Sequence, residues 1–270
     1  MNNLFDVEGK VVLITGGAGV LGGNMAQVLA SRGAIVGIMG LRPEEAENAV
    51  QNIKNNGGKA FSVVANVLNK ESLEVVRDYI LKEFGHLDIL INAAGGNMPG
   101  ATIGQDQAIY DMSQEDLQKV LDLNIIGTML PSQVFSEIFA KQKSGIIINI
   151  SSASAQRPLT RVVGYSASKA AIDNFTKWMA VEMATKFGEG IRVNAIAPGF
   201  FIGKQNRDLL LTPEGNLTPR GEKIIDMTPM KRFGVPEDLD GALMFLCSDA
   251  SKFVTGVVIN VDGGFGVSSI

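Results

Sequence analysis

The chain has 270 residues, a net charge of −4 and a single cysteine, Cys247. A hydrophobic fraction of 46% with 19% charged residues is typical of a globular protein and excludes a disordered one. The acidic balance offers no basic patch for nucleic acid or an anionic membrane, and no apolar run approaches the ~18 residues of a membrane helix. One cysteine excludes an intramolecular disulfide, and the first ten residues do not form a signal peptide. We therefore expect a soluble cytoplasmic protein.

Short apolar runs alternate with helical segments along the chain. Seven strands alternating with helices predict a single domain, residues 1–270, with a doubly wound, mostly parallel Rossmann-type sheet and helices on both faces. Such a sheet binds its ligand at the carboxyl ends of its strands. The expected strands are residues 10–15, 34–39, 59–65, 87–92, 146–150, 191–197 and 257–261. The expected helices include residues 43–55, 70–84, 113–143, 165–188 and 236–246.

A glycine-rich turn follows the first strand. Gly17, Gly19 and Gly22 form a G-x-G-x-x-G pattern between a strand and a helix. Glycines let the backbone approach a pyrophosphate, and the helix N-terminus stabilises its negative charge. The alternative is a tight turn without a ligand. We expect a dinucleotide to contact Gly16, Gly17, Gly19, Val20, Leu21 and Gly22.

The second strand is followed by Gly40, Leu41 and Arg42, with no acid before Glu44. An acid at this point usually binds the ribose 2′-hydroxyl of NAD. Its absence removes a repulsion against a 2′-phosphate, which Arg42 can pair with. NADP(H) is therefore slightly favoured over NAD(H). The alternative is that Arg42 is a surface residue and that the site accepts both cofactors.

Three polar side chains suggest a proton-transfer site. Tyr165 and Lys169 are four residues apart and share one helix face, where the ammonium would lower the pKa of the phenol. Ser152 follows the strand at 146–150 and can bring its hydroxyl next to that phenol. The alternative for the tyrosine and lysine is an exposed helix face. Asn124 lies between apolar neighbours in the helix 113–143 and must find partners if it is buried.

Other strand ends converge on the same crevice. Residues 92–95, Asn-Ala-Ala-Gly, end the fourth strand with small side chains, and Pro198-Gly199 ends the sixth. The long stretch 200–221 is expected to be a lid or substrate loop. The only histidine, His86, has no companion ligands, so no metal is expected.

These motifs together resemble the short-chain dehydrogenase/reductase family over nearly the whole chain. The residues that carry the resemblance are TGGAGVLG at 15–22, NAAG at 92–95, Asn124 in LDLN, Ser152 in NISS, YSASK at 165–169, APG at 197–199 and VDGG at 261–264. The resemblance implies that Tyr165 is the general acid and base in a hydride transfer at the nicotinamide. It also implies that Lys169 lowers the pKa of Tyr165 and holds the nicotinamide ribose, that Ser152 positions the substrate oxygen, and that Asn124 holds a relay water.

The same resemblance implies cofactor contacts from several further positions and a homotetramer. The additional cofactor contacts are Asn66, Val67, Asn92, Ala93, Ala94, Gly95, Pro198 and Gly199. Asn66 replaces the usual aspartate, Val20 replaces a loop glycine, and Gly203 replaces a threonine after Pro-Gly. The tetramer would use the helix with Trp178, which is apolar on more than one face, and the helix near 242–245. A wholly interior helix is the alternative.

Within the family, the chain is similar to members of the D-mannonate oxidoreductase (fructuronate reductase) type. The similarity lies in residues 95–102, 158–169 and 199–234. It implies a small-molecule hexuronate ketone, whose carboxylate needs cations and whose hydroxyls need amides. The candidate cations are Arg161, Lys204 and Arg207, and the candidate amides are Asn97, Gln205 and Asn206. The alternatives are another carbonyl (a keto-gluconate, a polyol or a 3-oxoacyl thioester) or a dinucleotide sensor without catalysis.

Overall fold

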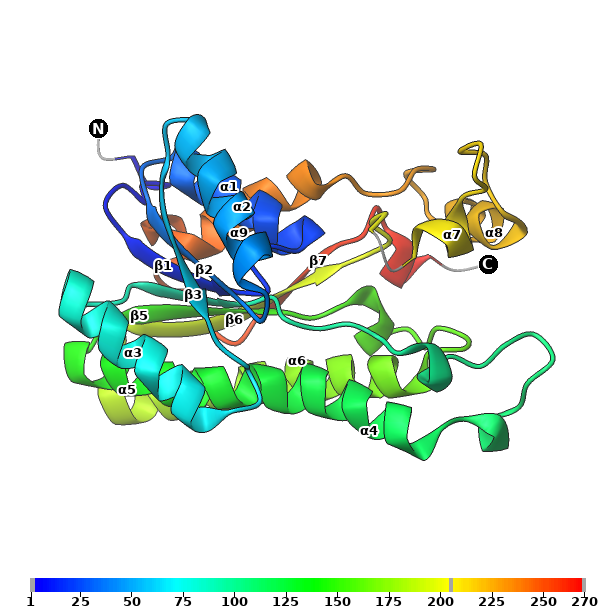
Figure 1. Ribbon diagram of the computed structural model, residues 1–270, viewed down its shortest axis with the longest axis horizontal. Helices are drawn as coiled ribbons and strands as arrows, with labels where there is room; N and C mark the ends of the chain where they lie inside the picture. Colours follow the sequence, from blue (N-terminus) through cyan, green and yellow to red (C-terminus); the bar gives the residue numbers. More distant parts are fainter. Residues whose placement is uncertain (1–2, 204–205, 269–270) are drawn as a thin grey trace.

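A computed structural model describes residues 3–203 and 206–268, and its seven strands form one parallel sheet (Figure 1). The strand order is β3-β2-β1-β4-β5-β6-β7, and every neighbouring pair is parallel. The expected doubly wound sheet is confirmed. The strands are β1 (Val11–Thr15), β2 (Ile35–Gly40), β3 (Lys59–Val64), β4 (Ile89–Asn92), β5 (Gly145–Ile150), β6 (Ile191–Pro198) and β7 (Val258–Val261).

Helices cover both faces of the sheet (Figure 1). On one face lie α1 (Val20–Ser31), α2 (Pro43–Asn55) and α9 (Asp240–Cys247), and on the other lie α3 (Lys70–Phe84), α5 (Gly127–Gln142) and α6 (Val163–Phe187). Alternate residues of β1 serve the two cores: Val12 and Ile14 pack on the first face, Val11 and Leu13 on the second. Burial on both faces explains why β1 and β4 are almost continuously apolar.

The strand register brings the carboxyl ends together at one edge. Thr15 pairs in register with Asn92, Asn92 with Asn149, and Asn149 with Ala195. The segments that follow β4 and β6 extend beyond this edge, on the right of Figure 1. These two segments therefore lie at the edge of the sheet where the ligand crevice is expected.

The stretch expected to be a long loop is partly helical. It contains the single turn α7 (Arg207–Leu210) and the beginning of α8 (Pro219–Met227). An antiparallel bridge between Leu211 and Leu217 closes the turn between them. Pro219 occupies the first turn of α8, and the hydroxyl of Thr218 caps that helix by accepting from the Gly221 N–H at 3.1 Å.

Two expected helices are interrupted. The helix expected over 113–143 divides into α4 (Gln114–Leu121) and α5, joined by a π-helical turn at Asp122–Ile126. The helix expected at 236–246 begins as a 3₁₀ turn, Pro236–Leu239, before α9.

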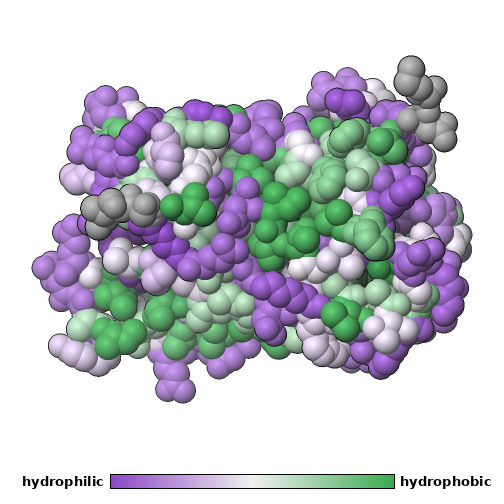
Figure 2. All heavy atoms as spheres, turned by 180° about the vertical axis from the view of Figure 1, so that it is seen from behind, coloured by the Kyte–Doolittle hydropathy of each residue, from purple (hydrophilic) through white to green (hydrophobic). Residues whose placement is uncertain are grey.

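The surface carries exposed apolar side chains. On α6, Trp178 is 59% exposed and Val181 is 68% exposed, and Phe253 near β7 is fully exposed. Seen from behind, apolar side chains gather in patches between polar regions (Figure 2). The helix with Trp178 is thus not wholly interior. None of the helices in the described part of the chain combines the length and apolar character needed to cross a membrane.

Candidate active site

Polar side chains fasten the carboxyl ends of the central strands. The Thr15 hydroxyl accepts from the backbone N–H groups of Ala93 at 3.1 Å and Ala94 at 3.0 Å. Asn92, expected to contact a cofactor, is 2% exposed, and its Nδ2 donates to Asn149 Oδ1 at 2.9 Å. The same amide donates to Ser132 Oγ at 2.8 Å. The Asn92 side chain therefore holds the sheet together, and the backbone of 93–95 borders the crevice.

The glycine turn has the shape of a pyrophosphate cradle. Gly16 has a φ of +63°, and a Cβ on Gly22 would lie 2.4 Å from the Gly16 carbonyl oxygen. A Cβ on Gly16 would lie 2.9 Å from Ala94 Cα, so larger residues would displace the β1 and β4 ends. Gly19 caps α1 without a side-chain acceptor, and a phosphate can satisfy the first N–H groups of that helix. These residues fit a dinucleotide.

The region where the adenosine ribose is expected is open. A Cβ added to Gly40 would meet nothing within 4 Å, which leaves room beyond β2. Arg42 lies at the surface and forms an ion pair with Glu45 at 3.1 Å. Asn66 is exposed at the end of β3, and its Oδ1 accepts from the Leu68 N–H at 2.9 Å. One lone pair of that oxygen is left for an adenine amino group.

Ser152, Tyr165 and Lys169 meet beyond the end of β5. Lys169 is 4% exposed, and its Nζ donates to the Ile150 carbonyl oxygen at 2.8 Å. The same Nζ lies 5.5 Å from the centroid of the Tyr165 ring. Ser152 Oγ accepts from the Ser154 N–H at 3.1 Å, and its side chain lies near enough to the phenol to lower the pKa of Tyr165. The structure thus brings the three expected residues together.

The pKa of Tyr165 differs from the sequence expectation. Burial raises the pKa of the phenol, and the hydrogen bond with Ser152 opposes that rise only in part. Burial also lowers the pKa of Lys169 to about 8, against an opposing effect of Asp173. The expected lowering of the phenol pKa by Lys169 is therefore not observed. The Lys169 ammonium instead donates to the Ile150 carbonyl oxygen, and burial decides the direction in which the pKa of the phenol moves.

Asp173 is a neighbour of the site that the sequence analysis missed. It lies one helical turn after Lys169 and accepts a short hydrogen bond from the Ser151 hydroxyl. Burial raises the pKa of its carboxyl, and the bond from Ser151 opposes this rise. The Lys-x-x-x-Asp spacing on α6 was the available signal, because it repeats the spacing between Tyr165 and Lys169.

Asn124 is buried in the π-helical turn and faces the same crevice. Its Nδ2 donates to the carbonyl oxygens of Gly96 at 2.7 Å and Val120 at 2.8 Å, and its Oδ1 accepts from the Gly96 N–H at 3.2 Å. A Cβ on Gly95 would lie 2.8 Å from this Oδ1 and 3.3 Å from Lys169 Nζ. Asn124 Oδ1 and Lys169 Nζ therefore both lie next to Gly95. The expected relay water would have a lone pair of Oδ1 available.

The expected substrate residues lie in different surroundings. Asn97 donates to Thr102 Oγ1 at 2.6 Å, and its Oδ1 is buried without a hydrogen-bond partner among the described residues. Asn206 uses its amide internally, donating to Phe201 O at 2.8 Å and accepting from Gly203 N at 2.7 Å. Arg207 is exposed at the start of α7. Lys204 and Gln205 lie outside the described residues.

Two half-buried arginines are further candidate cations. Arg161, expected from the sequence, is half-buried, and its Nε donates to the Ile103 carbonyl oxygen at 2.6 Å. Arg220, which the sequence analysis missed, is half-buried in the first turn of α8. Burial lowers the pKa of Arg220, and the positive charge of Arg161 lowers it further. An arginine in the first turn of a helix gave no signal, because that position usually favours acids.

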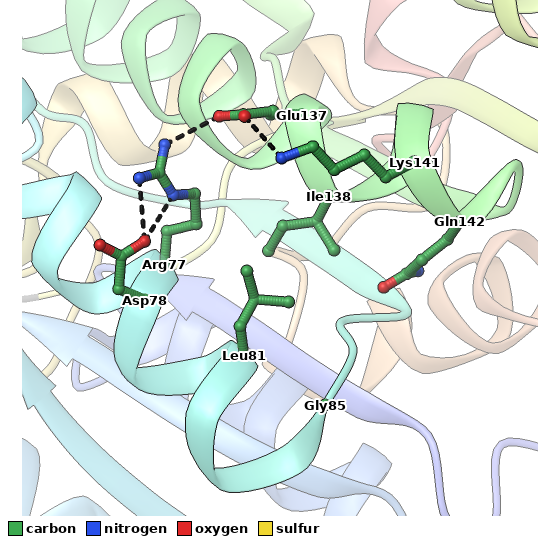
Figure 3. Close-up of a pocket in the computed structure, with 8 residues that line it drawn as sticks. All are labelled: Arg77, Asp78, Leu81, Gly85, Glu137, Ile138, Lys141 and Gln142. Atoms are coloured by element: carbon green, nitrogen blue, oxygen red, sulfur yellow. Dashed lines mark hydrogen bonds and ion pairs between the residues drawn. The ribbon is translucent and has the colours of Figure 1, made fainter.

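A separate cavity of about 290 Å³ lies between α3 and α5 (Figure 3). Its lining includes Gly85 and Gln142, which precede β4 and β5, so it is remote from the carboxyl ends. Arg77 in this cavity binds Glu137 and Asp78, each at 2.8 Å, and its charge is already balanced. Among the described residues, no group of three or more His, Cys, Asp or Glu side chains could hold a metal ion.

Known proteins resemble this chain over almost its full length. The profile of the family described as Enoyl-(Acyl carrier protein) reductase matches residues 17–266. An uncharacterized oxidoreductase, UxuB, of Bacillus subtilis is 48% identical over 96% of both chains. A crystal structure from Haemophilus influenza with bound NAD, provisionally named a D-mannonate oxidoreductase, is 43% identical, with a TM-score of 0.91 and 98% and 97% coverage. A gluconate 5-dehydrogenase of Burkholderia cenocepacia, in complex with NADP and tartrate, is 28% identical, with a TM-score of 0.87 and 99% and 98% coverage.

Proposed function

Because the chain belongs to the short-chain dehydrogenase/reductase family of oxidoreductases, we propose that it interconverts the ketone and secondary-alcohol forms of a sugar acid. The D-fructuronate/D-mannonate pair is the preferred substrate. The observation that carries the proposal is the placement of Ser152, Tyr165 and Lys169 together beyond the end of β5, with the half-buried Arg161 four residues before Tyr165. The provisional name of the Haemophilus relative supports the same substrate class.

We assign each of these side chains a step in a carbonyl reduction. A bound nicotinamide supplies or accepts the hydride. Ser152 hydrogen-bonds the substrate oxygen and holds it beside the Tyr165 hydroxyl. Tyr165, protonated because burial raises its pKa, donates its proton to that oxygen as negative charge develops there. Lys169, with a pKa of about 8, can then return a proton toward the phenol, and Asn124 borders the path.

The cofactor is NAD(H) or NADP(H), and we propose that the protein accepts NADP(H) through Arg42. The open space at Gly40 can receive a 2′-phosphate, and the surface ion pair between Arg42 and Glu45 costs little to exchange for a phosphate contact. NAD in the Haemophilus relative supports acceptance of the other cofactor as well. Gly16–Gly22 would bind the pyrophosphate, and Lys169 would hold the nicotinamide ribose.

The assembly we propose is a homotetramer. Trp178 and Val181 leave an apolar face of α6 uncovered, and Phe253 does the same near β7. Exposed aromatic and aliphatic side chains on a packed helix are typical of subunit interfaces.

The proposed function is tested by following nicotinamide absorbance with a panel of substrates. The panel contains hexuronates, aldonates, keto-gluconates, polyols and 3-oxoacyl esters, each with NADH and NADPH or their oxidised forms. We expect the highest kcat/KM with a hexuronate ketone. A preference for a 3-oxoacyl ester would contradict the substrate class, and binding of dinucleotide without turnover of any carbonyl would favour a sensor.

A further inference from the structure

Two side-chain hydrogen bonds join α6 to the end of β5, directly before Ser152. Lys169 Nζ donates to the Ile150 carbonyl oxygen at 2.8 Å. The Ser151 hydroxyl donates a short hydrogen bond to the carboxylate of Asp173, which lies one helical turn after Lys169. Ile150 and Ser151 are consecutive and lead directly into Ser152. The chain that precedes Ser152 is therefore held to α6 at two successive residues.

A third hydrogen bond continues this arrangement into the core. Asn149 Nδ2 donates to Thr176 Oγ1 at 2.9 Å, and both side chains are fully buried. Asn149 and Ser151 are two residues apart, so their side chains point to the same face of the extended chain. Their partners on α6 are spaced by three residues and share one helix face. The three bonds form a polar ladder, Asn149–Thr176, Ser151–Asp173 and Lys169–Ile150.

Asp173 is the buried acid of this ladder. Its side chain is 8% exposed, and within the described part of the chain no ion pair includes it. Burial raises the pKa of its carboxyl, and the hydrogen bond from Ser151, with the nearby Gln156, Lys177 and Lys169, opposes that rise. A buried carboxylate needs hydrogen-bond donors, so the bond fixes the direction of the Ser151 hydroxyl.

The position of Ser151 restricts the residue that follows it. The Ser151 N–H donates to the Ile196 carbonyl oxygen of β6 at 2.8 Å, so the sheet holds its backbone while α6 holds its side chain. Ser152 continues with extended backbone, and its Oγ accepts from the Ser154 N–H at 3.1 Å. A residue held at backbone and side chain leaves its neighbour little freedom to move. The ladder therefore limits how far the Ser152 hydroxyl can shift relative to Tyr165.

We propose that Ser151 and Asp173 are positioning residues, whose hydrogen bond holds Ser152 in register with Tyr165 and Lys169. The inference rests on the proposed function and adds two residues that act through their neighbours. The bond joins the two elements that carry the proton-transfer site, because Tyr165 and Lys169 lie on α6 and Ser152 follows β5. A displacement of the reacting groups by about 1 Å can lower a rate roughly 100-fold, so we expect the bond to act mainly on kcat.

The test removes the bond from each side and measures catalysis per binding site. Steady-state kinetics with the best substrate of the panel, and NADH binding by fluorescence, are measured for the unmodified protein, Ser151→Ala, Asp173→Asn and Ser151→Thr. Expressing kcat per NADH-binding site excludes unfolded protein. Ser151→Ala should lower kcat roughly tenfold or more and change the Kd for NADH little, because the glycine turn is untouched.

The two conservative variants should retain more activity. Asp173→Asn keeps an acceptor oxygen for the Ser151 hydroxyl, but the bond loses its charge, so kcat should fall by a smaller factor than in Ser151→Ala. Ser151→Thr keeps the hydroxyl and should retain most of kcat. This order follows the hydrogen bond, and a role in general stability would not produce it.

Thr176→Val is the matched control, because it removes a hydroxyl from the inner bond of the same ladder. It leaves the buried Asn149 amide without this acceptor, so the urea midpoint of unfolding should fall. Its kcat per NADH-binding site should match that of the unmodified protein. A fall in kcat as large as that of Ser151→Ala would show that the ladder acts through stability alone and would overturn the proposal.

The outcomes separate this inference from the proposed function. If the unmodified protein reduces a carbonyl compound and Ser151→Ala retains its kcat, the positioning role is wrong and the proposed function stands. If the unmodified protein binds NADH but turns over no carbonyl of the panel, the proposed function is wrong, and the positioning role is wrong with it. Should Ser151→Ala fail to fold, Asp173→Asn decides, because an unchanged kcat in that variant would overturn the proposal.

Discussion

The Asn124 side chain donates to the Val120 carbonyl oxygen at 2.8 Å, four residues earlier in the chain. In a regular α-helix that oxygen would accept from the backbone N–H of residue 124. The side-chain amide therefore adds a donor to this carbonyl and supports the π-helical turn between α4 and α5. Through Gly96, the same amide fastens the segment after β4 to this turn.

Replacing Asn124 should cost stability as well as activity. Asn124→Leu leaves the buried polar atoms of Gly96 without this partner, and each lost partner costs about 1–3 kcal/mol. Urea unfolding of the cofactor-free protein measures the loss. Gln118→Ala, which removes an exposed bond to Asp122 on α4, should change the free energy of unfolding by less than ~0.5 kcal/mol. Equal stability of the two variants would contradict the role given to Asn124.

Tyr165→Phe should lower turnover by orders of magnitude without preventing cofactor binding. The substitution removes only the hydroxyl that donates the proton, which general acid catalysis makes worth roughly 10²–10⁴-fold in rate. Turnover is measured with the best substrate of the panel, and NADH binding is measured by its fluorescence. Unchanged turnover would refute the assignment of Tyr165.

The stability of the cofactor-free protein should rise with pH because of Lys169. The ordinary lysine pKa of 10.5 falls to about 8 in the folded protein, so between these values the unfolded chain binds more protons. Stability then increases with pH across that window, by up to about 3 kcal/mol. The buried Cys247 acts in the opposite sense above pH 9, because burial raises its pKa to about 12.

The difference in the free energy of unfolding between the unmodified protein and Lys169→Met isolates the contribution of the lysine, since Cys247 is common to both. Chemical unfolding at pH 7, 8, 9 and 10 should show the advantage of the unmodified protein over the variant increasing with pH. A constant difference across this range would show that the Lys169 pKa is not lowered by burial.

Arg42 and Glu45 should act on cofactor choice in opposite directions. Arg42→Ala removes the cation available to a 2′-phosphate, so kcat/KM with NADPH should fall and kcat/KM with NADH should change little. Glu45→Ala releases Arg42 from its ion pair and should favour NADPH. The ratio of kcat/KM for the two cofactors is the measurement, and a ratio unaffected by both substitutions would remove Arg42 from the site.

Trp178 should mark a subunit interface. Trp178→Glu places a charge on the exposed apolar face of α6 and should lower the molar mass measured by light scattering after size exclusion. Tyr110→Glu changes an aromatic residue that is 86% exposed outside this face, and it should leave the mass unchanged. An identical mass for all three proteins would exclude the Trp178 face from the assembly.

The sheet could be predicted because each strand is recognised from a short run of neighbouring residues. Apolar runs such as 146–150 are long enough to identify strands, and the helices 43–55 and 70–84 match α2 and α3. The π-helical turn at Asn124 could not be predicted, because it depends on hydrogen bonds to Gly96, which is distant in sequence. The helices inside 200–221 were missed because Gly and Pro residues interrupt the pattern.

The site was predicted where its residues share one element or one motif. Tyr165 and Lys169 share a helix, and Ser152 directly follows a strand, so their meeting follows from the chain path. The pKa of Tyr165 could not be predicted, because burial depends on how the folded chain packs around the phenol. Arg220 was missed because the stretch 200–221 was expected to be a loop, whereas Arg220 lies in the first turn of α8.

The hydrogen bond from Lys169 to the last carbonyl of β5 distinguishes the residues that transfer the proton from those expected to recognise the substrate. It joins α6 to β5, the strand that Ser152 follows, so the elements that hold the proton-handling groups are bonded to each other. Asn97 and Arg161, in contrast, depend on the segments that extend beyond that edge. Evolution can therefore remodel these outer segments for a new carbonyl compound while the inherited reaction is left intact.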